Sequence, residues 1–174
     1  MTRTTSAVAA LVLVVGGLVA AGAEQAKNLL KDSNKPESWR LELNGQGKGT
    51  MTASEDGVLV DVATAGAENW HVQAYVQGLN LEEGKEYTFS YKAKGDPART
   101  IIVSANINEE DWHTIGIQED VEIGKEWNEH THTFKAENVA KNNKNRIGFI
   151  LGTETGKIWI KDATLTEKAG AAAK

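Results

Sequence analysis

The sequence predicts an all-β protein built as a two-sheet sandwich, and three observations lead to this prediction. Apolar residues recur at every second position in short runs between residues 28 and 168, which is typical of half-buried strands. The segments between these runs carry turn residues, such as Asn44-Gly45 and Asp56-Gly57. Helical periodicity is scarce, because only residues 137–144 offer a turn or so, and their asparagines favour a loop.

About nine segments follow this alternation, and their spacing of roughly 10–15 residues is typical of antiparallel sandwiches. In chain order they are residues 41–43, 58–62, 70–76, 87–93, 101–107, 115–117, 131–134, 147–151 and 158–160. No internal repeat and no second domain are visible in the sequence. We therefore place one domain at residues 24–168, with Phe89 in its core, followed by a low-complexity, frayed tail at residues 169–174.

The first 23 residues are typical of a cleaved signal peptide. Arg3 precedes an apolar run from Ala7 to Val19, and Ala21-Gly22-Ala23 supplies small residues for a signal peptidase. An uncleaved membrane anchor is the alternative, but glycines interrupt the stretch and its length is at the short end for a span. We expect a mature chain that begins at Glu24, is secreted, periplasmic or on the cell surface, and has no membrane contact after cleavage.

Composition excludes several functions. The 174 residues carry 19 Lys and Arg against 24 Asp and Glu, a net charge of −5, so a phosphate-binding stripe for nucleic acid is not expected. The chain has no cysteine, which excludes disulfides, thiolate zinc sites and cysteine nucleophiles. With 40% hydrophobic residues and only two prolines, the chain has a globular composition. We expect a monomer that is stabilised by core packing.

Four segments resemble a known family when they are taken together. They are Asn28-Leu29-Leu30 with Trp39, residues 69–75 (NWHVQAY), residues 79–94 (LNLEEGKEYTFSYKAK), and residues 147–152 (IGFILG) with 157–162 (KIWIKD). The chain thereby resembles the family 4/9 carbohydrate-binding modules found beside bacterial cellulases and xylanases, over most of residues 28–167. The resemblance implies a jelly-roll β-sandwich that binds a polysaccharide or oligosaccharide in a groove on its concave sheet.

The chain departs from the family pattern at two places. Family members commonly have an acidic Asn-Gly-x-Phe-Glu element after the opening leucines, which often helps to hold a structural calcium. This chain has residues 31–35 (KDSNK) there, so we expect no metal and no other cofactor. Many members have a polar residue where this chain has Ile150, so one sugar hydrogen bond would be missing and the affinity modest, or the ligand different.

The residue types also suit a sugar, because a pyranose has an apolar face and a rim of hydroxyls that aromatic and amide side chains can match. If Val72 and Ala74 face the core, alternation directs their neighbours outward. Residues 101–107 repeat the pattern, and a polar loop with a tryptophan follows them. The candidate carbohydrate-binding residues are Trp70, His71, Gln73, Tyr75, Asn106, Asn108, Trp112 and His113.

The tryptophans also have structural interpretations. Trp39 and Trp127 each begin a strand where the family keeps a buried aromatic, so we expect core or sheet-edge packing. Trp159, between two isoleucines, is expected to cover the convex face. For Trp70, strand alternation indicates the core, whereas the resemblance implies a tryptophan that stacks on the ligand. Trp112 has no expected core role and is the first candidate platform.

Two sequence patterns suggest catalytic alternatives to a binding module. Gly124, His130-x-His132 and Glu137 match part of a cupin metal motif, but no histidine follows His132 to complete the ligand set. Glu109, Glu110 and Asp111 are adjacent, so they would need a distant partner such as Glu119 or Asp120 to act on a glycosidic bond. We expect no enzyme activity and no catalytic residue. A structural or adhesive module that binds a protein partner is the main alternative, and a small polysaccharide-active enzyme ranks third.

Overall fold

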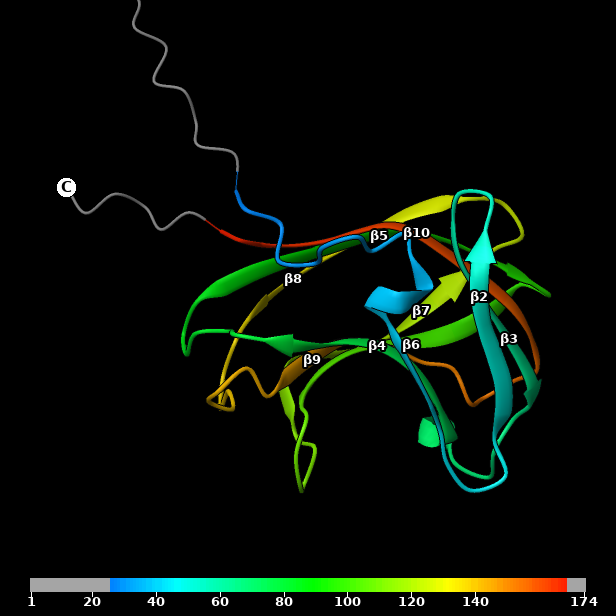
Figure 1. Cartoon of the computed structure of the whole chain (residues 1–174), viewed down its shortest axis with the longest axis horizontal. Helices are drawn as coiled ribbons and strands as arrows, with labels where there is room; N and C mark the ends of the chain where they lie inside the picture. Colours follow the sequence, from blue (N-terminus) through cyan, green and yellow to red (C-terminus); the bar gives the residue numbers. More distant parts are fainter. Residues whose placement is uncertain (1–25, 169–174) are drawn as a thin grey trace, which may run out of the picture.

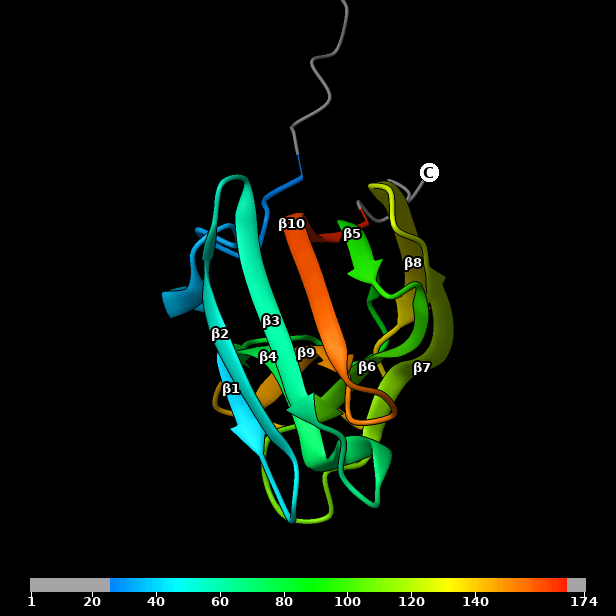
Figure 2. The same ribbon diagram turned by 90° about the vertical axis from the view of Figure 1, so that its right-hand side faces the viewer.

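The protein is a sandwich of two five-stranded antiparallel sheets, as a computed structural model that describes residues 26–168 shows (Figures 1 and 2). The predicted signal peptide at residues 1–23 and the predicted tail at residues 169–174 lie outside the described residues. We call the sheet with strand order β1-β4-β9-β6-β7 the front sheet and the sheet with order β2-β3-β10-β5-β8 the back sheet. The prediction of an all-β, two-sheet sandwich is confirmed.

The strands of the front sheet are β1 (Arg40–Leu43), β4 (Val72–Leu79), β9 (Asn145–Ile150), β6 (Arg99–Ile107) and β7 (Thr114–Ile123). The back sheet contains β2 (Lys48–Ser54), β3 (Gly57–Thr64), β10 (Gly156–Glu167), β5 (Glu86–Asp96) and β8 (Asn128–Lys135). Two short 3₁₀ helices, η1 (Pro36–Ser38) and η2 (Asn69–His71), precede β1 and β4. Within residues 26–168, no helix is long and apolar enough to cross a membrane.

The described part of the chain has ten strands, and the alternation missed β2 for a physical reason. This strand is at the edge of the back sheet, and none of its side chains is buried. Its only large apolar residue is Met51. Period two becomes visible only where one face of a strand is buried. Residues 69–71 differ in another way, because they form η2 and not the beginning of a strand. Residues 137–144 form a loop, as expected.

The core lies between the sheets and is built from the alternating apolar residues. Phe89, with no exposed surface, packs against Phe149 with ring centroids 5.8 Å apart, and Tyr91 meets the same ring edge-on at 4.8 Å. Trp39 stacks on Phe149 from the entrance to β1, and its indole N–H donates to the Ser33 carbonyl at 2.8 Å. The expected burial of Trp39 is confirmed, since it is 6% exposed.

The outer face of the back sheet carries two of the remaining tryptophans. Trp159, on β10, and Trp127, directly before β8, are both partly buried and flank Lys94, whose ammonium is 5.0 Å from one ring and 5.1 Å from the other. Lys161 lies over the Trp127 ring at 4.5 Å. Both indoles therefore cover lysine stems and sheet surface, as expected for sheet packing.

Asp162, the acidic residue that ends the family-like segment 157–162, lies where β10 bulges. Asp162 has a φ of 54°, and its backbone N–H donates to the side-chain oxygen of Asn34 at 2.6 Å. One carboxylate oxygen of Asp162 accepts from the Asn34 amide at 3.2 Å, and the other lies 3.1 Å from the Lys92 ammonium. Calcium takes about six to eight oxygen ligands, whereas the side-chain groups that contact the Asp162 carboxylate here are an amide nitrogen and an ammonium, so this corner does not fit a calcium site. Within residues 26–168, no group of three or more metal-ligating side chains occurs.

We expect a chelator to leave the melting temperature of the protein unchanged. The physical reason is that the Lys92 ammonium already provides the positive charge beside Asp162. Thermal unfolding with and without EDTA tests this. Substitution of Lys92 by Met is the control and should cost about 0–1 kcal/mol, as exposed ion pairs usually do. A fall of several degrees in EDTA that calcium reverses would contradict the expectation.

Candidate carbohydrate-binding site

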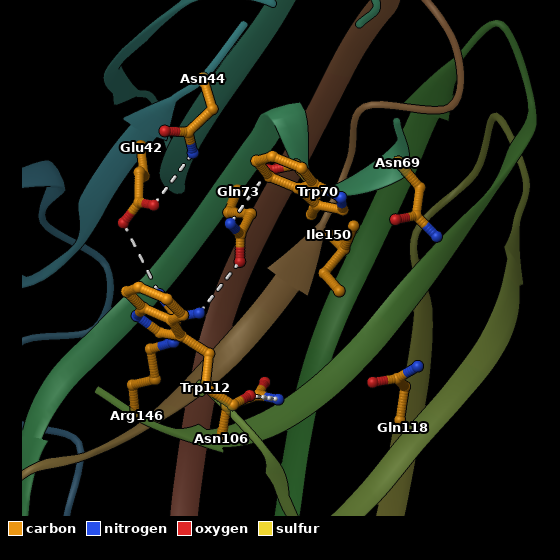
Figure 3. Close-up of a pocket in the computed structure, with 10 residues that line it drawn as sticks. All are labelled: Glu42, Asn44, Asn69, Trp70, Gln73, Asn106, Trp112, Gln118, Arg146 and Ile150. Carbon is orange, nitrogen blue, oxygen red and sulfur yellow. Dashed lines mark hydrogen bonds and ion pairs between the residues drawn. The ribbon is translucent and has the colours of Figure 1, made fainter. Parts of the chain in front are cut away.

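A pocket of about 560 Å³ lies on the outer face of the front sheet (Figure 3). Its lining combines two tryptophans, amides, one isoleucine and one pair of opposite charges. The lining residues are Glu42, Asn44, Asn69, Trp70, Gln73, Asn106, Trp112, Gln118, Arg146 and Ile150. We call it the front-sheet pocket. Four of the predicted sugar-binding residues meet here, namely Trp70, Gln73, Asn106 and Trp112.

Trp70 is 46% exposed, because η2 turns it away from the core. The helix is fixed by hydrogen bonds to its neighbours: Gly152 N–H donates to the Asn69 carbonyl at 2.9 Å, and the Gln73 amide donates to the Trp70 carbonyl at 3.0 Å. A side chain at position 152 would clash with Asn69, since an added Cβ would lie 2.4 Å from the backbone carbonyl oxygen of Asn69. The indole therefore reaches the pocket from a rigid support.

Trp112 is 53% exposed and lies in the loop between β6 and β7. Both Asp111 and Trp112 have a positive φ, 70° and 44°, which is uncommon for side chains of this kind and persists only where contacts enforce it. The Trp112 N–H donates to the Glu109 carbonyl at 3.0 Å, and the Trp112 carbonyl accepts from the Asn106 amide at the same distance. These contacts fix the backbone from which the Trp112 indole reaches the pocket.

His113 is not among the residues that line the pocket, but its ring contacts the same loop. Its Nδ1 lies 2.7 Å from an Asp111 carboxylate oxygen, and its Nε2 lies 2.8 Å from the Asn138 carbonyl. Both partners are acceptors, so the protonated imidazole, which donates from both nitrogens, satisfies them best. The Asn138 carbonyl and then Asp111 raise the pKa of His113 above its ordinary 6.5. Hydrogen bonds from His113 in turn lower the pKa of Asp111.

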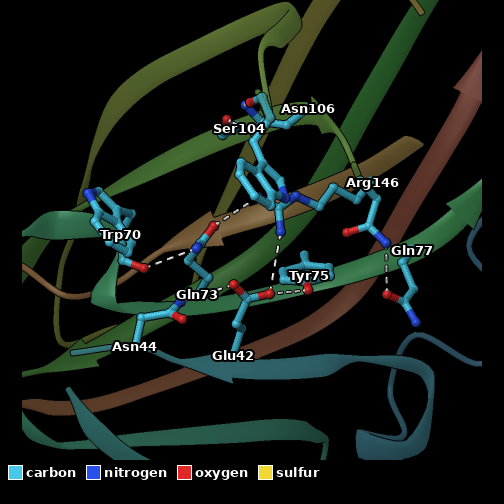
Figure 4. Close-up of polar contacts among 11 residues, drawn as sticks. Glu42, Asn44, Trp70, Gln73, Tyr75, Gln77, Ser104, Asn106 and Arg146 are labelled. Atoms are coloured by element: carbon cyan, nitrogen blue, oxygen red, sulfur yellow. Dashed lines mark hydrogen bonds and ion pairs between the residues drawn. The ribbon is translucent and has the colours of Figure 1, made fainter. Parts of the chain in front are cut away.

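The floor of the pocket is a hydrogen-bonded chain of polar side chains (Figure 4). Gln73 links the two ends, since its amide donates to Trp70 and its oxygen accepts from Arg146 Nη2 at 3.3 Å. Arg146 stacks on the Tyr75 ring, with Cζ 4.4 Å from the ring centroid. The Tyr75 hydroxyl donates to Glu42. Gln73 and Tyr75 face outward as predicted, yet they are only 8% and 4% exposed because this chain of contacts covers them.

Glu42 is ionised and partly accessible. Burial raises its pKa, but hydrogen bonds from Tyr75 and Asn44 together with the charge of Arg146 outweigh this, and the net pKa lies below 4.5. Burial and the bond to Glu42 raise the pKa of the Tyr75 phenol, which stays neutral and donates. Glu42 lies 3.6 Å from Arg146, measured from Oε2 to Nη1. The two charges compensate each other at the floor of the pocket.

A glycine on β9 allows this floor to be so closely packed. An added Cβ on Gly148 would lie 2.2 Å from the Ala74 oxygen and 2.8 Å from the Tyr75 Cβ. Ile150, two residues further on, lines the pocket with an apolar side chain. The position that many family members keep polar is thus apolar in this pocket.

The other predicted residues do not line the pocket. The His71 ring lies against Gly45 and Gly66, because η2 breaks the period of two at this point. Asn108 donates to Gln77 at 3.2 Å, and His113 holds the loop as described above. Tyr75 supports Glu42 and Arg146 from beneath. Of the predicted set, His71, Asn108 and His113 are therefore separated from the pocket lining.

Sequence reasoning did not include Glu42, Asn44, Asn69, Gln118 and Arg146 among the site residues. A signal for two of them was present. Glu42 is the polar residue between Leu41 and Leu43, and Arg146 precedes Ile147 on a predicted strand, so alternation places both on the outer face. Their proximity to each other depends on strand order, which alternation does not provide.

The catalytic alternatives can be compared with the geometry. His132 Nδ1 lies 2.9 Å from Glu119, and both His130 and His132 stack against Tyr91, while Glu137 pairs with Lys135 at 3.2 Å. In the predicted acidic loop, Glu109 pairs with Lys144 at 2.6 Å, and Asp111 binds His113. His132 and the acids named here thus each pair with a neighbour, whereas His130 only stacks on Tyr91.

Comparison with known proteins agrees with this architecture. The sequence profile of the carbohydrate binding domain family, group 4/9, matches residues 31–156. A solved structure described as "CBM4 structure and function" is 26% identical, with a TM-score of 0.66 over 80% of this chain and 93% of that one. No curated protein sequence matches the chain significantly.

Two cellulose-binding domains of Cellulomonas fimi β-1,4-glucanase C share the fold. The N-terminal domain is 20% identical with a TM-score of 0.61, covering 80% of this chain and 94% of its own. The second N-terminal domain is 18% identical with a TM-score of 0.65, covering 85% and 99%. The fold defines a β-sandwich module. The chain belongs to the carbohydrate binding domain family, which confirms the resemblance seen in the sequence.

We expect the affinity for a glycan to depend on pH through the loop that carries Trp112. Because the pKa of His113 is raised, its stabilising contacts are complete below pH 6.5 and are lost as the pH rises through the raised pKa. Because the pKa of Asp111 is lowered, its contribution is lost only as the pH falls through that lowered value. Affinity should therefore decline on the alkaline side.

Titration of a bound oligosaccharide between about pH 5 and about pH 9 measures this decline, a range that brackets histidine ionisation. The nearby side chains of Glu109 and Lys144 pair with each other at 2.6 Å, apart from His113. The matched control is His113→Gln, which should flatten the alkaline side. The same decline in both proteins would show that His113 does not cause it.

Proposed function

We propose that this protein is a secreted, non-catalytic module that binds a polysaccharide chain in the front-sheet pocket. The observation that carries the proposal is the combination of two exposed tryptophans with amides in one pocket: Trp70 and Trp112 beside Gln73 and Asn106. Indoles offer flat faces for the apolar side of a sugar ring, and amides can both donate to and accept from its hydroxyls. A pocket filled by aliphatic side chains would have favoured the adhesive alternative.

The proposal of a non-catalytic role rests on the acids of the pocket. Glycoside hydrolysis uses two carboxyl groups, roughly 5–10 Å apart, one of which has a raised pKa. Glu42 is the one carboxylate among the residues that line the pocket, and its pKa is lowered. An ionised, ion-paired carboxylate is a hydrogen-bond acceptor and a poor general acid. These features support binding without hydrolysis.

Export completes the proposal. The apolar run from Ala7 to Val19 followed by Ala21-Gly22-Ala23 supports cleavage of a signal peptide and release outside the cytoplasmic membrane. N-terminal sequencing of the exported protein should give Glu24 as the first residue.

A glycan array followed by calorimetric titration of cello- and xylo-oligosaccharides tests the proposed function. We expect binding to at least one chain, and no new reducing ends after prolonged incubation with it. Absence of binding to every polysaccharide would contradict the binding proposal. Release of reducing ends would contradict the non-catalytic part, and the control is Glu42→Gln, which removes the carboxylate of the pocket.

A further inference from the structure

Two charges of opposite sign lie among the otherwise uncharged residues of the front-sheet pocket, and they differ in accessibility. Arg146 is 6% exposed, and its guanidinium is enclosed by the Tyr75 ring, the Gln73 oxygen and the Glu42 carboxylate. The Glu42 side chain is 30% exposed. A ligand in the pocket can therefore reach Glu42 more easily than Arg146.

Glu42 keeps capacity for another hydrogen bond. Its Oε1 accepts from the Asn44 amide at 3.0 Å, and its Oε2 accepts from the Tyr75 hydroxyl and faces Arg146. An ionised carboxylate accepts up to about four hydrogen bonds. Asn44 and Tyr75 fix the orientation of the carboxylate, so that a further donor would meet a positioned acceptor. A sugar hydroxyl is such a donor.

Arg146 would bind a carboxylate if its charge were free, since a guanidinium forms strong paired hydrogen bonds with carboxylates. In this pocket Glu42 compensates that charge. A uronic acid brought to Arg146 would also approach the negative charge of Glu42. Two further acids, Glu68 and Glu110, are exposed near the aromatic residues, each two positions before a pocket tryptophan, and the whole chain carries −5.

We propose that Glu42 is a specificity-determining residue: it accepts a hydrogen bond from a sugar hydroxyl and, by compensating Arg146, excludes glycans that carry uronic acids. Arg146 is a positioning residue in this arrangement. The inference rests on the proposed function, because it describes how the same pocket selects its glycan. The preference for uncharged glycan chains would then depend on the ion pair between Glu42 and Arg146.

The test compares two probes with the wild-type protein and with Glu42→Gln. One probe is a neutral xylo-oligosaccharide, and the other is the same oligosaccharide bearing a glucuronic acid. Glutamine keeps the shape of the side chain and its hydrogen bond to a hydroxyl but removes the charge. We expect the wild type to prefer the neutral probe, and we expect the substitution to shift the ratio of the two affinities about tenfold toward the acidic probe, a change of about 1.4 kcal/mol.

A matched control separates the pocket from net charge. Glu129, exposed on β8 of the back sheet, can be changed to Gln with the same change in total charge, and the ratio should stay at the wild-type value. A second variant, Glu42→Asp, keeps the charge but withdraws the acceptor. It should weaken binding of the neutral probe and still exclude the acidic probe. Circular dichroism verifies that each variant is folded.

The outcomes separate this inference from the proposed function. If the wild type binds the neutral probe and Glu42→Gln leaves the ratio as Glu129→Gln does, the inference is wrong and the proposed function stands. If the wild type binds neither these probes nor any other glycan, the proposed function is wrong and the inference falls with it. If the wild type prefers the acidic probe, Glu42 does not exclude uronic acids and the inference is wrong.

Discussion

Substitution of Trp112 by Ala is expected to reduce affinity for a bound oligosaccharide ten- to more than a hundredfold. Stacking on a sugar ring removes apolar surface from water at about 25 cal/mol per Å², so loss of one indole platform should cost roughly 1.5–3 kcal/mol. Folding stability should change little, because Trp112 is 53% exposed and packs outside the core. Isothermal titration and thermal unfolding of the variant measure both quantities.

Trp127→Ala is the matched control for Trp112→Ala. Trp127 is also an indole at a sheet surface, but it lies beside β8 on the back sheet and covers Lys94 and Lys161. Its loss should leave affinity unchanged. Equal affinity in the wild type and Trp112→Ala, or a large loss of stability in that variant, would show that Trp112 is not a binding platform.

Substitution of Phe89 by Ala is expected to cost about 3–5 kcal/mol of folding free energy, the usual range for a buried aromatic residue. Phe89 has no exposed surface and contacts both Tyr91 and Phe149, so the truncation would leave a cavity between the sheets. The pocket lies on the outer face of the front sheet and shares none of these atoms. Urea unfolding measures the loss.

The variant should still bind glycan where it is folded. If Phe89→Ala retained wild-type stability, the assignment of this residue to the core would be wrong. If the variant lost affinity while it remained fully folded, the core and the pocket would be coupled, contrary to the separation seen between the two faces of the front sheet.

The sequence alone predicted the fold because burial of one strand face leaves a period of two. Val72 and Ala74 on β4 and Val103 on β6 are buried between the sheets. On each strand, the residues that alternate with these core residues face outward. The same argument identified Gln73 and Asn106 as outer-face residues. Where no face is buried, as in β2, the period and therefore the prediction were absent.

The pocket was predicted less completely than the fold, for two physical reasons. Alternation applies only within a strand, so it misplaced His71, which η2 turns against Gly45 and Gly66. Alternation also gives no information on which strands are neighbours. Glu42 on β1 and Arg146 on β9 meet because both strands are neighbours of β4, and their side chains reach each other across its outer face. That strand order is a property of the whole sheet.

The exposure of Trp70 shows the value of the family resemblance beside the physical pattern. Alternation placed this residue in the core, whereas the resemblance implied a tryptophan on the ligand side. The structure has it 46% exposed at the pocket, because the short helix η2 replaces the first residues of the expected strand. Local backbone geometry decided between two interpretations that the sequence left open.

The most direct test of glycan binding in the front-sheet pocket is an NMR titration that follows the indole N–H signals of the tryptophans. The chain has five of them: Trp70 and Trp112 at the pocket, Trp39 in the core, and Trp127 and Trp159 on the back sheet. With a bound cello- or xylo-oligosaccharide, we expect the signals of Trp70 and Trp112 to shift and the other three to stay in place. Shifts confined to Trp127 and Trp159, or no shift at saturating binding, would contradict the account.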